Sequence, residues 1–253
     1  MNYNTILNIP ERALINKRLT KTFFLRNFEL STAEKKFLNN DVLGMSWLAS
    51  IKTSNSNIPE FKDDKYQFEE LQVMIVTLNN KLNELHKRAF ELLQKYIPYQ
   101  LFIIVEDTEE FIINVCDKRI NLNDKSKRTI EAYYTTSIIS KLYKNEITSK
   151  FYESLSFTHL NKTNLKTAYT SWTQAIIQYK AACLTGQFQN KSQYRTEEDM
   201  NLLLKIERIE QEIISLTSQI KKESQLNAKV DLNIKIQQSR KEIEAIKNTL
   251  SQA

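Results

Sequence analysis

Two heptad repeats near the C-terminus constrain the fold of this chain more than any other feature. The first places apolar residues at intervals of three and four, at Leu202, Ile206, Ile209, Ile213, Leu216 and Ile220. The second contains Leu232, Ile236, Ile243, Ile246 and Leu250, with Ser239 at one position of the repeat. This spacing puts one side chain per half-heptad on a single helix face, as in helices that pack along a coiled-coil seam.

The two repeats are out of phase, because Ile220 and Leu232 are 12 residues apart. A shift of that size requires a stutter in one long helix or a turn within residues 221–233. Each repeat spans 19 residues, as two arms must if their seams are to face each other. We therefore predict a helical hairpin, with Asp231 available to cap its second helix. The alternative is a continuous helix, whose exposed repeats would need a partner and make the protein an obligate oligomer.

Residues 1–186 have the pattern of a mixed α/β domain. Apolar residues alternate with small or polar ones in 43–51, while 71–78 and 101–105 are apolar on both faces, as buried strands are. Helical spacing in 79–96 and 165–184 places helices between and after these strands, with Gly186 as a C-cap. We expect a mixed β-sheet flanked by helices over residues 1–186, a linker at 187–196 and a coiled-coil arm at 197–253.

Three N-terminal segments give local predictions. Pro10 followed by Glu11 favours a helix start, and helical spacing continues to Leu19. The aromatic segment 22–28 is expected to be extended. Ser31 and Glu34 form the sequence pattern of a capping box, so a helix should begin there.

Composition removes several classes of function. The chain has only two glycines, and loops that bind phosphate groups through backbone N–H groups need more. A P-loop or dinucleotide-binding turn is therefore excluded, and we expect no cofactor. No apolar run is long enough for a membrane span. Two distant cysteines and two histidines predict a reducing cytoplasmic setting and no zinc site.

Positive charge is concentrated in two segments. Residues 11–36 contain seven Lys and Arg against three Asp and Glu, and residues 117–150 contain eight against four. Basic surfaces attract nucleic acid by neutralising phosphates. In the second segment the candidate nucleic-acid-binding residues are Lys118, Arg119, Lys125, Lys127 and Arg128. The alternative is that a Lys-rich composition raises the net charge to +6 without any such role.

The best candidate for chemistry is Glu70 with Gln72. Two residues apart on a strand, they point to the same face, and a buried carboxylate is costly unless it is paired or binds a metal. Restriction-type nucleases hold a divalent metal with one acid and, later in the chain, a Glu that is followed two positions on by a second polar residue. Asp63 or Asp64 could therefore complete a Mg²⁺ site with Glu70. Gln72 stands where such nucleases usually have a lysine, and Lys52 could take the role of that lysine if the fold brings it near. The simpler interpretation is a local ion pair, which predicts no catalytic and no metal site.

Several blocks of residues, in this order, resemble one family. They are Ile9-Pro10, Trp47 with Lys52 and Asn57-Ile58, Glu70-Leu71-Gln72-Val73, Ile97-Pro98-Tyr99 with Leu101-Phe102, and residues 222–233. The sequence resembles the bacterial domain of unknown function 4391 family, whose members are typically encoded with helicases and DNA methyltransferases in restriction-like, anti-phage gene clusters. That family has no established catalytic residues, so the resemblance implies none here.

The resemblance implies an association with DNA-targeting defence, and we predict an accessory, non-catalytic subunit of such a system. Its partners would be a helicase or DNA methyltransferase of the same gene cluster, and possibly DNA, with the coiled coil serving assembly. Two alternatives stay open: a metal-dependent nuclease that uses Glu70 with Asp63 or Asp64, and a homo-oligomer without a role on DNA.

Overall fold

The computed structural model of the protein describes residues 1–82, 85–125 and 127–252. The chain forms two compact units, Met1–Ile176 and Ile177–Ala253, and the boundary falls inside helix α7 (Leu165–Thr185). Among the described residues, no helix combines the length and apolar character needed to span a bilayer.

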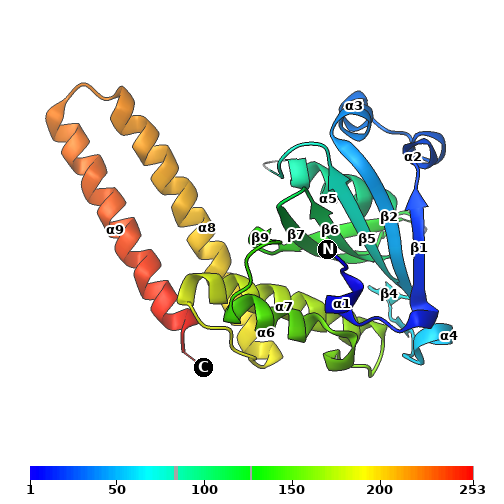
Figure 1. Ribbon diagram of the computed structural model, residues 1–253. Coiled ribbons are helices and arrows are strands. Elements are labelled where there is room, and N and C mark those ends of the chain that lie inside the picture. The colour runs from blue at the N-terminus through cyan, green and yellow to red at the C-terminus, as the bar shows by residue number, and fades with distance from the viewer. Residues whose placement is uncertain (83–84, 126, 253) are drawn as a thin grey trace. The chain divides into compact units, whose positions relative to one another are not determined.

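The first unit is built on a mixed sheet with strand order β1-β2-β5-β6-β7-β8, in which β9 also pairs with β7. Strands β5 and β6 are parallel, and the other pairs are antiparallel. The fold is therefore mixed α/β, as predicted (Figure 1). The strands are β1 (Leu14–Leu19), β2 (Val42–Ile51), β5 (Leu71–Leu78), β6 (Gln100–Glu106), β7 (Glu110–Ile120), β8 (Arg128–Thr135) and β9 (Ile139–Ser140), with a separate hairpin of β3 (Phe61–Lys62) and β4 (Gln67–Phe68).

Helices cover both faces of this sheet. On one face Phe37, Leu38 and Leu93 pack with strand residues such as Met74 and Ile103 in a single apolar cluster. On the other face the Trp172 ring lies 4.8 Å from that of Phe102, and the Trp172 indole N–H donates to the Leu155 carbonyl. The helices of this unit are α1 (Asn4–Leu7), α2 (Lys21–Asn27), α3 (Thr32–Asn40), α4 (Thr53–Ser56), α5 (Leu85–Tyr96), α6 (Glu146–Leu155), the start of α7, and the 3-10 turns Glu11–Ala13 and Phe157–His159.

Local sequence signals succeed where no distant contact competes with them. The Ser31 side chain and the Glu34 carboxylate form the predicted capping box, and α3 begins at Thr32. Gly186 follows α7 with φ +81°, in the left-handed region that suits a helix C-cap.

Two N-terminal predictions are wrong. Leu14–Leu19 is not helical, because it hydrogen-bonds to β2 as the edge strand of the sheet. Residues 21–27 are not extended but form α2. The Thr20 hydroxyl accepts the Phe23 N–H at the helix start, and Phe24 is fully buried. In both cases contacts with the sheet and its core override the local pattern.

The second unit contains the helical hairpin that the repeats predict. Helices α8 (Gln193–Lys222) and α9 (Leu226–Leu250) are joined by residues 223–225 (Figure 1). The Glu223 carboxylate accepts the Ser224 and Gln225 N–H groups, which stabilises the turn without glycine or proline. Asp231 lies inside α9 and is exposed, so it is not the cap of that helix.

Candidate functional site

Glu70 and Gln72 lie where the end of β2 meets the start of β5. Ser50 and Gln72 are partners in the register of these strands. The Glu70 carboxylate accepts hydrogen bonds from the Ser50 hydroxyl at 2.5 Å and from the Gln72 amide at 3.0 Å. Lys52 forms an ion pair with it at 3.1 Å. The structure thus brings together Glu70, Gln72 and Lys52, and it adds Ser50.

Each member of this cluster is held by the strands around it. Glu70 directly precedes β5 and Lys52 directly follows β2, so the sheet register fixes their separation. Only 7% of the Glu70 side chain is exposed, whereas 47% of Lys52 is exposed. A buried carboxylate is therefore neutralised by a cation whose ammonium group can still reach solvent.

Of the two aspartates of the nuclease hypothesis, Asp63 is engaged in other contacts and Asp64 is exposed. The Asp63 carboxylate accepts the Lys65 and Tyr66 N–H groups of the β3–β4 turn and forms an ion pair with Lys166 at 3.8 Å. Asp64 is exposed beside it. The described residues contain no group of three or more His, Cys, Asp or Glu placed to hold a metal ion. The groups that contact the Glu70 carboxylate are the Gln72 amide, the Ser50 hydroxyl and the Lys52 ammonium. Mg²⁺ prefers an octahedron of oxygen ligands instead.

A second polar cluster lies at the opposite end of the parallel strands β5 and β6. The Glu106 carboxylate accepts the Tyr3 hydroxyl at 2.6 Å and the Thr77 hydroxyl at 3.0 Å, and it pairs with Lys141 at 2.7 Å. Burial raises the pKa of Glu106, but Lys141 and the two hydroxyls outweigh that effect and lower it. Sequence reasoning missed this cluster, although an acidic residue directly after the buried run 101–105 was a usable signal.

The predicted nucleic-acid-binding residues do not form one surface. Lys118 is completely buried, and its ammonium group donates to the carbonyls of Ile97 and Tyr99 at 2.7 and 2.8 Å. It connects β7 to the segment after α5, and in this conformation its ammonium group is not available to an external phosphate. Burial lowers the pKa of Lys118 to about 8.

The other four residues of that set lie at or near the turn between β7 and β8. Arg119 pairs with Glu131 at 3.4 Å, and Lys127 pairs with Asp124 at 3.3 Å. The Arg128 guanidinium donates to Gln67 and to two nearby carbonyls. Lys125 is exposed. Two of these four cations, Arg119 and Lys127, are therefore compensated by acidic side chains within the protein.

The hairpin seam follows the predicted repeats, with one shift. Ile206, Ile209, Leu216, Ile236, Ile243, Ile246 and Leu250 are buried, and Ile213, Ile220 and Leu232 are half-buried. Leu203 is 3% exposed and takes the place expected for Leu202, which is half-buried. The stripe continues through Asp199 and Thr196, also buried, and their polar character concealed it from a search for apolar residues.

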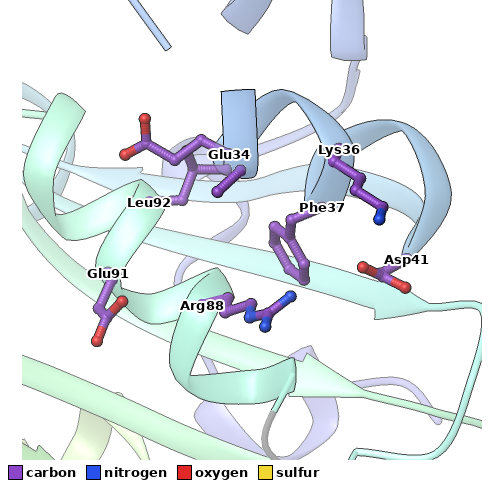
Figure 2. A pocket seen from close by; sticks show the side chains of 8 residues that line it. Glu34, Lys36, Phe37, Asp41, Arg88, Glu91 and Leu92 are labelled. Atoms are coloured by element: carbon purple, nitrogen blue, oxygen red, sulfur yellow. The ribbon is translucent and has the colours of Figure 1, made fainter. Parts of the chain in front are cut away.

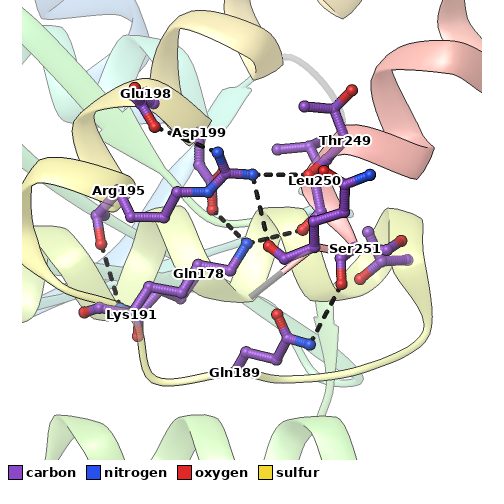
Figure 3. A network of polar contacts seen from close by, with 12 residues as sticks. Gln178, Gln189, Lys191, Arg195, Glu198, Asp199, Thr249, Leu250 and Ser251 are labelled. Carbon is purple, nitrogen blue, oxygen red and sulfur yellow. Dashed lines mark hydrogen bonds and ion pairs between the residues drawn. The ribbon is translucent and has the colours of Figure 1, made fainter.

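A polar network closes the base of the hairpin (Figure 3). The fully buried Asp199 carboxylate pairs with Lys191 at 2.9 Å and with Arg195 at 3.4 Å. The same cations reach the C-terminal end of α9, where Lys191 donates to the Leu250 carbonyl and Arg195 to the Thr249 carbonyl, both at 2.7 Å. Lys191 and Arg195 thus donate hydrogen bonds to carbonyls of the last helical turn, which have no partner within the helix.

A cleft of about 430 Å³ lies between α3 and α5. Figure 2 shows Lys36, Phe37 and Asp41 on one side of it and Arg88 and Glu91 on the other. Cations and carboxylates alternate around its rim, so the cleft has no uniform charge that would select a ligand.

Together these features define a mixed α/β protein with a helical-hairpin arm, in which a lysine-paired glutamate occupies one end of the sheet. The chain belongs to the family described as Domain of unknown function (DUF4391), whose family model matches residues 7–243. Comparison with curated proteins and with solved structures gave no match.

Proposed function

We propose that this protein is an accessory, non-catalytic subunit of a prokaryotic anti-phage or restriction-type defence system. It acts in the cytoplasm by binding a helicase or DNA methyltransferase encoded in the same gene cluster, or DNA itself. Membership of the family supports this proposal through the gene neighbourhood expected for that family.

The observation that carries the proposal is the outer surface of the hairpin arm. The arm buries its own seam yet leaves aliphatic side chains in water: Ile214 is 61% exposed, Val230 49% and Ile234 50%. Val230 and Ile234 are four residues apart, so they lie on one face of α9. An arm that does not need these side chains for its own packing can use them to bind another protein.

Co-purification of the chain with the helicase and methyltransferase encoded beside it tests this proposal. Changing Val230 and Ile234 to Glu should abolish a complex that the wild type forms on size exclusion, because two charges would enter an apolar contact. The matched control is Lys235→Glu, which makes the same change in net charge at an exposed position of α9 that does not share the face of Ile234, and it should keep the complex. A complex unaffected by the first pair excludes this face, and no complex with either partner contradicts the protein-binding proposal.

The homo-oligomer is tested by the same variants. Multi-angle light scattering on the isolated chain gives its mass in solution, and a dimer that the Val230 and Ile234 double variant dissociates would assign the face to a second copy of the chain.

The second candidate function is a metal-dependent nuclease. The observation in its favour is the convergence of Lys52, Glu70 and Gln72 on adjacent strand ends, in a sheet where a helix connects β5 to the parallel strand β6. Incubating supercoiled DNA with the protein and Mg²⁺ or Mn²⁺ tests it. Cleavage by the wild type that a folded Glu70→Gln variant lacks would replace the accessory role with an enzymatic one.

A further inference from the structure

We propose that the protein binds the phosphate backbone of DNA through a surface that we call the N-terminal cationic edge. It consists of exposed cations of the 3-10 turn before β1, of β1, of α2 and of α3, namely Arg12, Lys17, Arg18, Arg26, Lys35 and Lys36. This inference rests on the DNA-binding part of the proposed function and assigns DNA binding to particular residues.

The first argument is the difference in charge compensation between the two basic segments. In residues 117–150, Lys118 is buried, and Arg119, Lys127, Lys141 and Lys150 each form an ion pair with an acidic side chain. Among the residues that the structure describes, none of the six cations of the N-terminal cationic edge forms such a pair. An ammonium or guanidinium group without an internal partner keeps its full charge available for an external anion.

The acids of residues 11–36 do not offset this charge. Within the part of the chain that the structure describes, Glu34 is the only one of the three in an ion pair, and its partner is Lys95 of α5, at 2.9 Å. It also accepts the Ser31 N–H within the capping box and the Tyr96 hydroxyl. Its charge is therefore compensated from outside the segment, which leaves Glu11 and Glu29, together with Asp41 beside Lys36 just after the segment, against the six cations.

The second argument is the position of these cations. Strand β1 is the free edge of the sheet, and α2 and α3 follow it at one end (Figure 1). Lys17 and Arg18 are opposite Trp47 and Ser46 of β2, so their side chains leave the edge strand toward opposite faces. A six-residue strand is about 20 Å long, and no strand of the described residues pairs with its outer side.

Helices α2 and α3 are joined in a way that extends this surface. The Lys21 ammonium group donates to the Asn39 carbonyl at 3.0 Å, which ties the start of α2 to the end of α3. Phe24 and Phe37 both enter the apolar core under the two helices. Arg26, Lys35 and Lys36 are thus carried by packed helices rather than by a loop, so the backbone positions from which their side chains project are fixed.

DNA fits this arrangement better than a membrane or an acidic peptide. A duplex presents about one phosphate per 1.7 Å of axis, so an edge of this length can meet several phosphates at once. Insertion into a bilayer needs a continuous apolar face, whereas α2 exposes Phe23 and Leu25 only by 42% and 38%. Cations spread over four elements also match a long, evenly charged ligand better than a short peptide.

The test compares two variants with the same change in net charge. The edge variant changes Lys17, Arg18 and Lys36 to Glu, and the control variant changes Lys125, Lys127 and Lys150 to Glu. The probe is a 30-base-pair duplex of random sequence, and its binding to the 253-residue chain is measured by fluorescence anisotropy between 50 and 200 mM salt. Variants with Gln at the same positions provide the measurement if either Glu variant does not fold.

Four neutralised phosphates would weaken wild-type binding roughly 100-fold over this salt range. Because each lost phosphate contact removes about one from the slope of log affinity against log salt, we expect the edge variant to lose about three. We expect the control variant to keep the slope of the wild type.

Several results would overturn the inference. Equal losses in both variants would show general attraction without a localised surface, and a loss in the control variant alone would return binding to the turn between β7 and β8. Unchanged binding by the edge variant would leave these cations only the role of protecting a free strand edge from aggregation. Binding to anionic vesicles but not to DNA would reassign the surface to a membrane.

The inference and the proposed function fail separately. If the wild type binds DNA but the edge variant is unaffected, only the inference fails. If the wild type binds no DNA yet forms a complex with the helicase or methyltransferase, the inference fails and the protein-binding role stands. If neither ligand binds, both are wrong.

Discussion

Two buried acids, Glu70 in the first unit and Asp199 in the second, are neutralised by their cations in different ways. In the first unit, Glu70 is paired with Lys52, whose side chain is 47% exposed. In the second unit, Asp199 is completely buried and is paired with Lys191, only 6% exposed, and with Arg195. Both buried acids have a cationic partner, as a buried charge requires. Of these cations, only Lys52 is exposed enough to move into solvent.

The difference separates a structural acid from an acid that remains chemically accessible. Lys191 and Arg195 also bind the last carbonyls of α9, so releasing Asp199 would disturb the end of a helix. Lys52 is bound to one acid at the end of a strand, and its departure would leave Glu70 with the Ser50 and Gln72 hydrogen bonds. Glu70 is therefore the acid at which a ligand could replace a protein cation.

The largest expected effect comes from removing the structural acid. Asp199→Ala should destabilise the second unit by about 3–5 kcal/mol, because it leaves two cations facing a buried site without their counter-ion. Hydrogen exchange of the α8 and α9 amides measures this locally. Glu197→Ala, an exposed change two residues earlier, should cost less than about 0.5 kcal/mol. Similar losses in both variants would mean that Asp199 has no special structural role.

The next effect concerns Glu70. Glu70→Ala should cost about 2 kcal/mol, because the Ser50 and Gln72 groups lose a buried acceptor. Lys52→Ala should cost less than about 1 kcal/mol, since a half-exposed ion pair contributes little. Urea unfolding of both variants measures the two losses. If Lys52→Ala were as harmful as Glu70→Ala, the contrast between an open and a closed ion pair would not hold.

Lys118 extends the comparison to a buried cation that has no acidic partner. Lys118→Met should destabilise the protein by about 1–2 kcal/mol, because the carbonyls of Ile97 and Tyr99 lose their donors. Burial lowers the pKa of Lys118 from 10.5 to about 8. Between these values the unfolded chain binds more protons than the folded one, so the wild type should gain stability relative to the variant as pH rises from 8 to 10.5. A flat or falling difference would contradict a buried, low-pKa lysine.

The smallest effect is expected for Glu34, an acid near the surface. Burial raises its pKa, but hydrogen bonds from Lys95, Ser31 and Tyr96 outweigh this and lower the pKa from 4.5 to about 2. Its contribution is therefore present above pH 4.5 and is lost as pH falls through 2. Because solvent screens the group, the loss should stay below about 1 kcal/mol. Thermal melts at pH 5 and pH 2.5 should differ less in Lys95→Ala than in the wild type.

Much of the fold follows from local patterns in the sequence. The heptad spacing and the phase shift between Ile220 and Leu232 favour two helices with facing seams over one continuous helix, and the structure has the hairpin. The capping box at Ser31, the C-cap at Gly186 and the doubly apolar run 71–78 depend on nearby residues, so sequence alone determines them.

What the sequence could not determine depends on residues far apart in the chain. Segment 14–19 has helical spacing, but β2 supplies hydrogen bonds that make it a strand. Lys118 looks like a surface cation until the sheet register brings its ammonium group beside two carbonyls at residues 97 and 99. The sequence determined which segments are apolar, basic or helical. Only the tertiary structure decided which charges are compensated, because an ion pair depends on distance in space and not on separation along the chain.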